Sequence, residues 1–147
     1  MAQNFGTDLF VVPWLTAHDA AEIDIVTRRK GKTTQVIDLD TVSDRVLIAQ
    51  ALILRLLTPR GTLKSLGHAQ YGSRLHELIG CRKTEALRNL CRLYVLETVA
   101  QEPRVKAKAV RVIFDRSSET PSSFAFHLEV SPLDEKETIT LSLEVSI

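Results

Sequence analysis

The hydrophobic positions of this chain change their period along the sequence. Between residues 41 and 104, apolar side chains recur at helical spacing, whereas residues 105–147 alternate apolar and polar side chains as β-strands do. These patterns predict an α+β fold with two main helices and a short helix packed on an antiparallel sheet, which ends in a C-terminal β-meander. We expect a single domain with three parts: an N-terminal arm and hairpin (1–40), a helical part (41–104) and a β part (105–147).

The clearest helical pattern lies in the second half of the helical part. We expect this helix to begin after Thr84, a suitable N-cap, and to stop near Gln101. Pro103 enforces the stop, because proline has no N–H to donate and disfavours the α conformation at the residue before it. The apolar stripe of this helix comprises Leu87, Leu90, Cys91, Tyr94, Val95 and Val99. Other apolar positions widen the stripe and predict a helix covered on more than one side: Ala86, Leu93, Leu96 and Ala100.

A second helix is expected over 43–57, where Thr41 and Asp44 have the spacing of a capping box. It is apolar nearly all round, with Gln50 and Arg55 as interruptions, so we expect it to be buried on both sides. Its apolar run is too short to cross a bilayer, which takes about 20 residues. The short helix is expected at 74–79, where glycines bound the segment on both sides.

Two strand-like runs precede these helices, near residues 23–27 and 34–39. The only basic cluster of the chain, residues 28–32, lies between them. We interpret this cluster as the tip of a β-hairpin, and binding of a phosphate or another anionic partner is the alternative.

The last strand of the β part alternates most cleanly. Its apolar face comprises Ile139, Leu141, Leu143, Val145 and Ile147. After Glu137 this strand carries only one charge, Glu144, and no proline. Because charges and proline are common means of blocking the edge of a sheet, we expect this strand to leave an edge open for pairing with another strand.

Composition and motifs point away from catalysis. The chain has 147 residues, a net charge of +1 and no extended basic block, which does not favour nucleic-acid binding. It lacks a phosphate loop, a Rossmann glycine pattern and a nucleophile elbow. Its four histidines and two cysteines show no metal-ligand spacing, and Cys91 is expected to be a core thiol. We therefore expect no enzymatic activity, no cofactor and no metal.

Two catalytic alternatives have no support in the spacing. One is an acid–base group formed by Tyr71, His76 and Glu77, and the other is a glycosidase-like pair of Glu77 and Glu102. The N-terminus carries no positive charge ahead of an apolar run, so we expect no secretory signal peptide.

The triplet Glu102-Pro103-Arg104 breaks a local rule at the end of the long helix. A carboxylate there has the wrong sign for the negative end of the helix dipole. One interpretation is a solvated Glu102–Arg104 pair that compensates this charge locally. The other is a rigid corner that presents a carboxylate and a guanidinium to a partner chain.

Three motifs follow one another in a recognisable order: Leu57-Thr58-Pro59-Arg60-Gly61, Tyr71-Gly72-Ser73-Arg74-Leu75-His76-Glu77-Leu78 and Glu102-Pro103-Arg104. On these motifs the chain, over about residues 40–147, resembles the baseplate wedge family of contractile phage tails and related injection systems. That family includes the small wedge protein of T-even phages and the GPW-like baseplate assembly protein W of temperate phages. Arg74 departs from the family pattern, in which a small residue often follows the serine.

The resemblance implies a structural subunit, present in six copies around the tail tube. Residues Glu102, Pro103 and Arg104 would meet the helical core bundle of larger wedge subunits. The C-terminal strands would accept strands of the sheath protein and so initiate assembly of the first sheath ring. Tube or hub proteins would be further neighbours, whereas nucleic acid and membrane would not be partners.

The same resemblance implies assembly in the bacterial cytoplasm, and a final place in the baseplate of a virion or of an extracellular injection particle. Two alternative functions stay open at this point. One is a lysozyme-like enzyme that degrades cell walls, and the other is an adaptor domain outside any tail.

Overall fold

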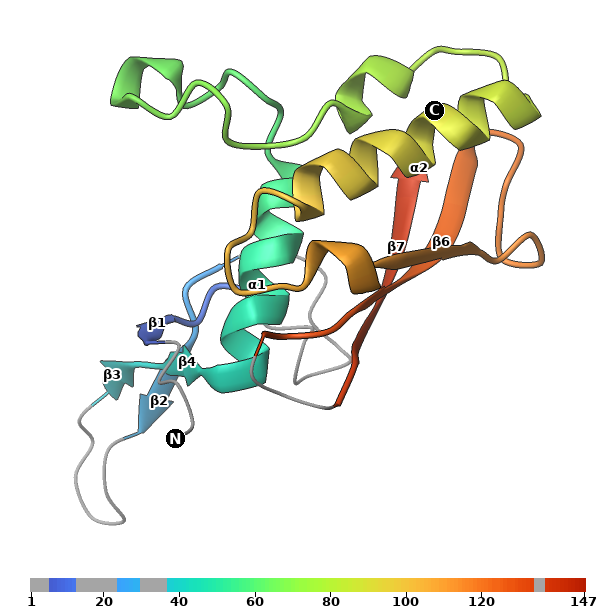
Figure 1. Cartoon of the computed structure of the whole chain (residues 1–147). Coiled ribbons are helices and arrows are strands. Elements are labelled where there is room, and N and C mark those ends of the chain that lie inside the picture. The colour runs from blue at the N-terminus through green and yellow to red at the C-terminus, as the bar shows by residue number, and fades with distance from the viewer. Residues whose placement is uncertain (1–5, 13–23, 30–36, 134–136) are drawn as a thin grey trace. The chain divides into compact units, whose positions relative to one another are not determined.

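The computed structural model describes residues 6–12, 24–29, 37–133 and 137–147 (Figure 1). The chain forms two compact units, Met1–Ala51 and Leu52–Ile147, and the boundary falls inside helix α1 (Asp44–Leu57). The described part contains two α-helices, and its named strands pair antiparallel. This architecture confirms the predicted α+β fold.

The first unit contains two short antiparallel pairs. Strand β1 (Thr7–Leu9) pairs with β4 (Thr41–Ser43), and β2 (Thr27–Arg29) pairs with β3 (Ile37–Leu39). The pairing of β2 with β3 is that of the predicted hairpin. Arg28 and Arg29, which were expected in its tip, instead lie in β2 opposite Asp38 and Ile37, and the rest of the predicted tip lies outside the described residues. The first strand of the hairpin begins later than the pattern predicted. The reason is that residues 24–26 instead bond to the N-terminal arm, where Asp24 N–H donates to Val11 O and Val26 N–H donates to Phe10 O.

A small core holds the first unit together. Phe10, Val42 and Leu47 are buried in it, and Val26 and Val46 pack against them. This core joins α1, which supplies Val46 and Leu47, to single residues of three short segments that lie far apart in the sequence.

Gln50 fastens the N-terminal arm to α1. Its side chain is almost fully buried, and its amide oxygen accepts from the N–H groups of Val11 (2.9 Å) and Val12 (3.3 Å). The amide nitrogen donates to Leu9 O at 2.8 Å. The polar residue that interrupts the apolar run therefore satisfies backbone groups that would otherwise be buried without partners.

Helix α1 is buried around most of its circumference, as predicted, but it does not begin with a capping box. Thr41 lies in β4 opposite Leu9, so its backbone is extended and its side chain is not at the helix N-terminus. The helix begins directly after that strand at Asp44, whose φ of 51° marks the abrupt change of direction. Pairing with β1 thus outweighs the local capping signal.

Helix α2 (Glu85–Val99) belongs to the second unit and begins as predicted. The Oγ1 of its N-cap Thr84 accepts a hydrogen bond from Leu87 N–H. Its buried positions are Arg88, Cys91, Tyr94, Val95, Thr98 and Val99. The expectation of cover on more than one side is wrong, because Ala86, Leu93 and Ala100 are exposed, with Leu93 57% exposed.

A three-stranded antiparallel sheet of order β5-β6-β7 confirms the predicted meander (Figure 1). Its strands are β5 (Arg111–Phe114), β6 (Ser123–Val130) and β7 (Ile139–Ser146). The ring of Phe114 packs edge-on against the rings of Phe124 and Phe126, with centroids 5.8 and 5.7 Å apart. The guanidinium of Arg88 lies over Phe114 and Phe124, which places α2 on this face of the sheet.

Short 3-10 turns connect the larger elements of this unit. The predicted short helix is such a turn, η3 (Leu75–Leu78), in which Leu75 and Leu78 are buried. Two more turns were not predicted: η2 (Lys64–Leu66) and η4 (Ala107–Ala109).

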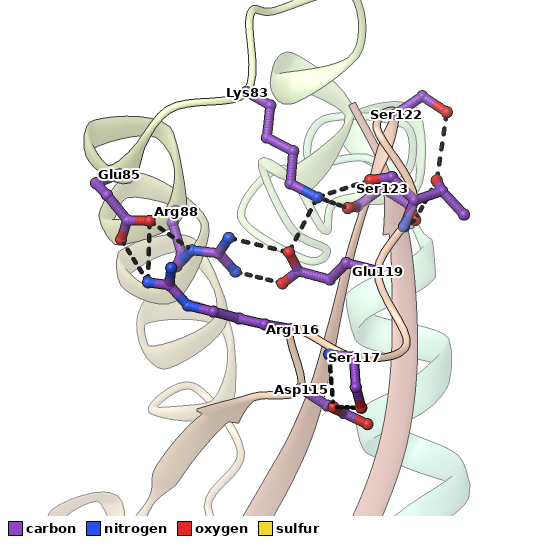
Figure 2. A network of polar contacts seen from close by, with 10 residues as sticks. Lys83, Glu85, Arg88, Asp115, Arg116, Ser117, Glu119, Ser122 and Ser123 are labelled. Atoms are coloured by element: carbon purple, nitrogen blue, oxygen red, sulfur yellow. Dashed lines mark hydrogen bonds and ion pairs between the residues drawn. The ribbon is translucent and has the colours of Figure 1, made fainter.

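A polar network binds the loop between β5 and β6 to the start of α2 (Figure 2). The buried carboxylate of Glu119 accepts from both terminal nitrogens of Arg88 and pairs with Lys83 Nζ at 2.9 Å. Lys83 also donates to the carbonyl oxygens of Thr120 and Ser123, each at 2.7 Å. The hydrogen bond from Arg88 lowers the pKa of Glu119 from 4.5 to about 2, against the opposing effect of burial.

Candidate functional site

The Glu102-Pro103-Arg104 corner links the end of α2 to the end of β6. Glu102 N–H donates to Val99 O at 3.0 Å, so the chain makes one more turn before Pro103. Beyond the corner, Arg104 O accepts from Leu133 N–H at 3.0 Å, and Val105 bridges to Pro132. The corner is therefore a fixed part of the fold.

Glu102 is buried in this corner. Its side chain is only 2% exposed, and its carboxylate accepts from Arg104 Nε at 2.6 Å and from Arg55 Nη2 at 3.5 Å. Burial by itself would raise the pKa of Glu102, but the hydrogen bond and charge of Arg104, with the charge of Arg55, outweigh burial and lower this pKa. The predicted solvated Glu102–Arg104 pair is thus wrong in one respect: the pair forms, but its carboxylate does not reach solvent.

Arg55 joins two motifs that lie apart in the sequence, the Tyr71 loop and the Glu-Pro-Arg corner. Its guanidinium carbon lies 4.6 Å from the centre of the Tyr71 ring, and its Nη2 faces Glu102. The Tyr71 loop and the Glu-Pro-Arg corner, about 30 residues apart, therefore share one arginine. Sequence reasoning missed this role, and the only signal for it was a charge within the otherwise apolar run of α1.

A second ion pair lies near the end of α2. Arg60 Nη1 pairs with Glu97 Oε1 at 2.7 Å, and Glu97 lies in the last turn of α2 before Glu102. Both acidic groups near the negative end of α2 thus have an arginine partner from outside the helix, which removes the unfavourable interaction with the helix dipole.

Gly72 and Ser73 hold the loop motif against the end of α1. Ser73 N–H donates to Thr58 O at 2.8 Å, Arg60 N–H donates to Ser73 O at 2.8 Å, and Ser73 Oγ donates to Leu56 O at 2.6 Å. Gly72 has a φ of 103°, and a Cβ on it would collide with the carbonyl oxygen of Thr58. Glycine is required here for both reasons. A β-bridge between Pro59 and Ser73 holds the two segments side by side.

Arg74 stabilises the next turn. Its guanidinium donates to both carboxylate oxygens of Glu77 at 2.8 Å and lies 4.5 Å from the centre of the Tyr94 ring. Its φ of −98° is accessible to any residue, so the backbone does not require a small residue at this position.

Glu77 and Glu102, the carboxylates of the two catalytic alternatives, have other partners. Glu77 bonds to Arg74 and to Tyr94 OH (3.0 Å), and the hydrogen bond from Arg74 lowers its pKa, so it is held ionised. Glu102 has its own arginine partners. Burial raises the pKa of Cys91 to about 12, which confirms it as a core thiol.

Strand β7 lies at the edge of the sheet in the described part of the chain. Ile147 N–H donates to Ser122 O at 2.8 Å, toward the β6 side. Backbone N–H and C=O groups alternate in direction along a strand. Every second residue before Ile147 therefore also directs these groups toward β6, and these residues are Ile139, Leu141, Leu143 and Val145. The backbone groups that point outward belong to the residues between them: Thr140, Ser142, Glu144 and Ser146.

These outward groups form no backbone hydrogen bond with any other described residue. The side chains of Ile139 and Leu141 are buried, whereas those of Leu143 and Val145 are only half-buried. The apolar residues predicted for strand pairing therefore supply the core face of β7, and the groups available for a further strand come from their polar neighbours.

Within the described residues, no cluster of His, Cys, Asp and Glu side chains is suited to hold a metal ion. No helix among them combines the length and hydrophobicity needed to cross a membrane. In comparisons with known proteins, no protein family, curated protein sequence or solved structure matches the chain.

Proposed function

We propose that this protein is a structural wedge subunit of a contractile tail or injection system. In this proposal it joins the core bundle of larger wedge subunits to the first sheath ring and initiates sheath assembly, with six copies in each particle. The observation that carries the proposal is the free outer edge of β7, an eight-residue strand paired on one side only in the described part of the chain. Backbone hydrogen bonds along such an edge suffice to add a strand from another chain.

The corner supports the proposal in a changed form. Because Glu102 is buried, the groups that the corner offers to a core bundle are the exposed ring of Pro103 and the partly exposed guanidinium of Arg104. Glu102 fixes the position of Arg104 from within the fold. We therefore assign the partner contact to Arg104 and a supporting role to Glu102.

The proposal needs no reaction and no cofactor. The subunit is assembled in the bacterial cytoplasm, and the sheath protein, larger wedge subunits and tube or hub proteins are its neighbours in a baseplate. The baseplate belongs to a virion or to an extracellular injection particle.

The test places a proline at the free edge. Glu144 directs its N–H outward, so Glu144→Pro removes one outward donor and puts a ring in the path of a new strand, while the bonds to β6 stay in place. Glu144→Ala is the matched control. We expect particles purified from cells that make the tail to carry sheath with the alanine variant and to be bare baseplates with the proline variant, as seen by electron microscopy.

Deletion of residues 139–147 is a harsher form of the same test and should also give bare baseplates. Full-length sheath on particles that contain the Glu144→Pro chain would refute the proposal. Absence of the tagged wild-type chain from every sheathed particle in the cell would refute it as well.

A further inference from the structure

An apolar groove opens beside the C-terminal half of β7. Its volume is about 350 Å³, and the strand contributes Glu144, Val145 and Ser146 to its lining. The other wall comes from the end of α1 and the turn around η3, with these apolar residues: Leu56, Leu57, Pro59, Leu75 and Ile79. Two of them are strongly exposed, Leu57 at 52% and Ile79 at 64%.

The groove coincides with the part of β7 whose apolar face is incompletely covered. Ile139 and Leu141 are buried, but Leu143 and Val145 are only partly buried. A strand added outside β7 places every second side chain on this same face, where the nearest one would lie beside Val145. An apolar side chain at that position fills the groove and completes the burial of Val145.

The polar face of the same edge has an unbalanced charge. Glu144 lies opposite Ala125 on β6, and its carboxylate has no ion pair or hydrogen bond with another described residue. A basic side chain on an added strand would supply the missing cross-strand partner, and opposite charges in that position attract.

We propose that the groove and Glu144 together select the added strand and set its register. The occupant is an extended segment of another protein, with an apolar residue beside Val145 and a lysine or arginine beside Glu144. This inference rests on the proposed addition of a strand at β7, and it goes further by stating which side chains the strand must carry.

The test uses the purified full chain and fluorescein-labelled peptides, with fluorescence anisotropy as the measurement. The first probe is an eight-residue peptide that alternates valine or leucine with threonine and carries one central lysine on the threonine face. The second has glutamate in place of that lysine, and the third has the same composition without alternation. Ile79→Asp charges the groove, and Leu93→Asp is its matched control because Leu93 is similarly exposed on α2, outside the groove.

We expect Ile79→Asp to weaken binding of the first peptide about tenfold, and Leu93→Asp to leave it unchanged within about twofold. The wild-type chain should prefer the lysine peptide over the glutamate peptide by about threefold, and Glu144→Lys should reverse this preference. The peptide without alternation should not bind.

Equal effects of Ile79→Asp and Leu93→Asp on peptide binding would overturn the inference. So would the absence of binding by any of the peptides, or self-association of the chain through β7 instead of peptide binding. Glu144→Pro separates this failure from failure of the proposed function. If Glu144→Pro abolishes peptide binding and Ile79→Asp does not change it, strand addition at β7 is supported and the role of the groove is refuted. If neither variant changes peptide binding, both the proposed strand addition and the role of the groove are refuted.

Discussion

The Glu-Pro-Arg corner and the outer edge of β7 belong to the same unit, and the sequence suggested both as partner-binding features, yet the fold uses them in opposite ways. At the corner, the carboxylate of Glu102 is buried and paired with two arginines of its own chain. At the edge, the backbone groups of alternate residues of β7 point away from the sheet without a partner among the described residues. A conspicuous motif can thus be part of the internal structure, while a plain strand supplies the free hydrogen-bonding groups.

This contrast predicts its largest effect at Glu102. Glu102→Ala would leave Arg55 and Arg104 without their shared carboxylate in a largely buried place, so we expect the free energy of unfolding to fall by about 3 kcal/mol. Chemical denaturation followed by circular dichroism measures this change. The isolated chain should already lose stability, because Glu102 holds two arginines inside the fold and does not act only through a partner.

The matched control for that variant is Glu144→Ala, which removes an exposed carboxylate at the edge. We expect this change to alter stability by less than about 0.5 kcal/mol. Equal losses in the two variants would break the distinction between corner and edge.

The next largest effect is expected at Gly72. Gly72→Ala combines a left-handed backbone with a collision against Thr58 O, so we expect a loss of about 2 to 3 kcal/mol. Gly67→Ala is the comparison, because Gly67 also has a positive φ of 83° but open space around it. Its smaller loss would isolate the contribution of the collision; thermal unfolding of the two variants side by side gives the answer.

Acid should weaken the interior pairs. The folded-state pKa of Glu119 is about 2, below its ordinary value of 4.5, so its pair with Arg88 and Lys83 stabilises the fold fully above pH 4.5. That stabilisation is lost as the pH falls from 4.5 toward 2, and Glu102 acts in the same direction. Denaturant midpoints measured at several pH values should fall over this window, and Glu119→Gln should flatten the dependence.

The last prediction concerns the corner's own surface. Arg104→Ala removes a partly exposed guanidinium and leaves the buried Glu102 carboxylate with Arg55 alone, so we expect the chain to stay folded with a loss of about 2 kcal/mol. The same variant should fail to join larger wedge subunits on size-exclusion chromatography. A normal complex would show that the corner contributes only to the fold.

The features that followed local periodicity were predicted well. The spacing around Thr84 gave the start of α2, and alternation gave the three strands of the meander. Both depend on residues within a few positions of one another, which a sequence pattern records directly.

The errors arose where a distant partner decides the outcome. Nothing in the local pattern assigned a role to Arg88, but the rings of Phe114 and Phe124 and the carboxylate of Glu119 bury it. Thr41 looked like a cap, but pairing with Leu9 makes it a strand residue. In each case the deciding group comes from another element, and no local pattern contains it.

The amide of Gln50 has a consequence for how the arm can attach. Its oxygen meets two donors, Val11 and Val12 N–H, while its nitrogen meets one acceptor, Leu9 O. An amide turned the other way would set its donors against the two N–H groups, so these three contacts fix the orientation of the side chain. Hydrolysis of this single amide to a carboxylate would likewise deprive Leu9 of its donor, so the orientation of the arm depends on one chemically labile side chain.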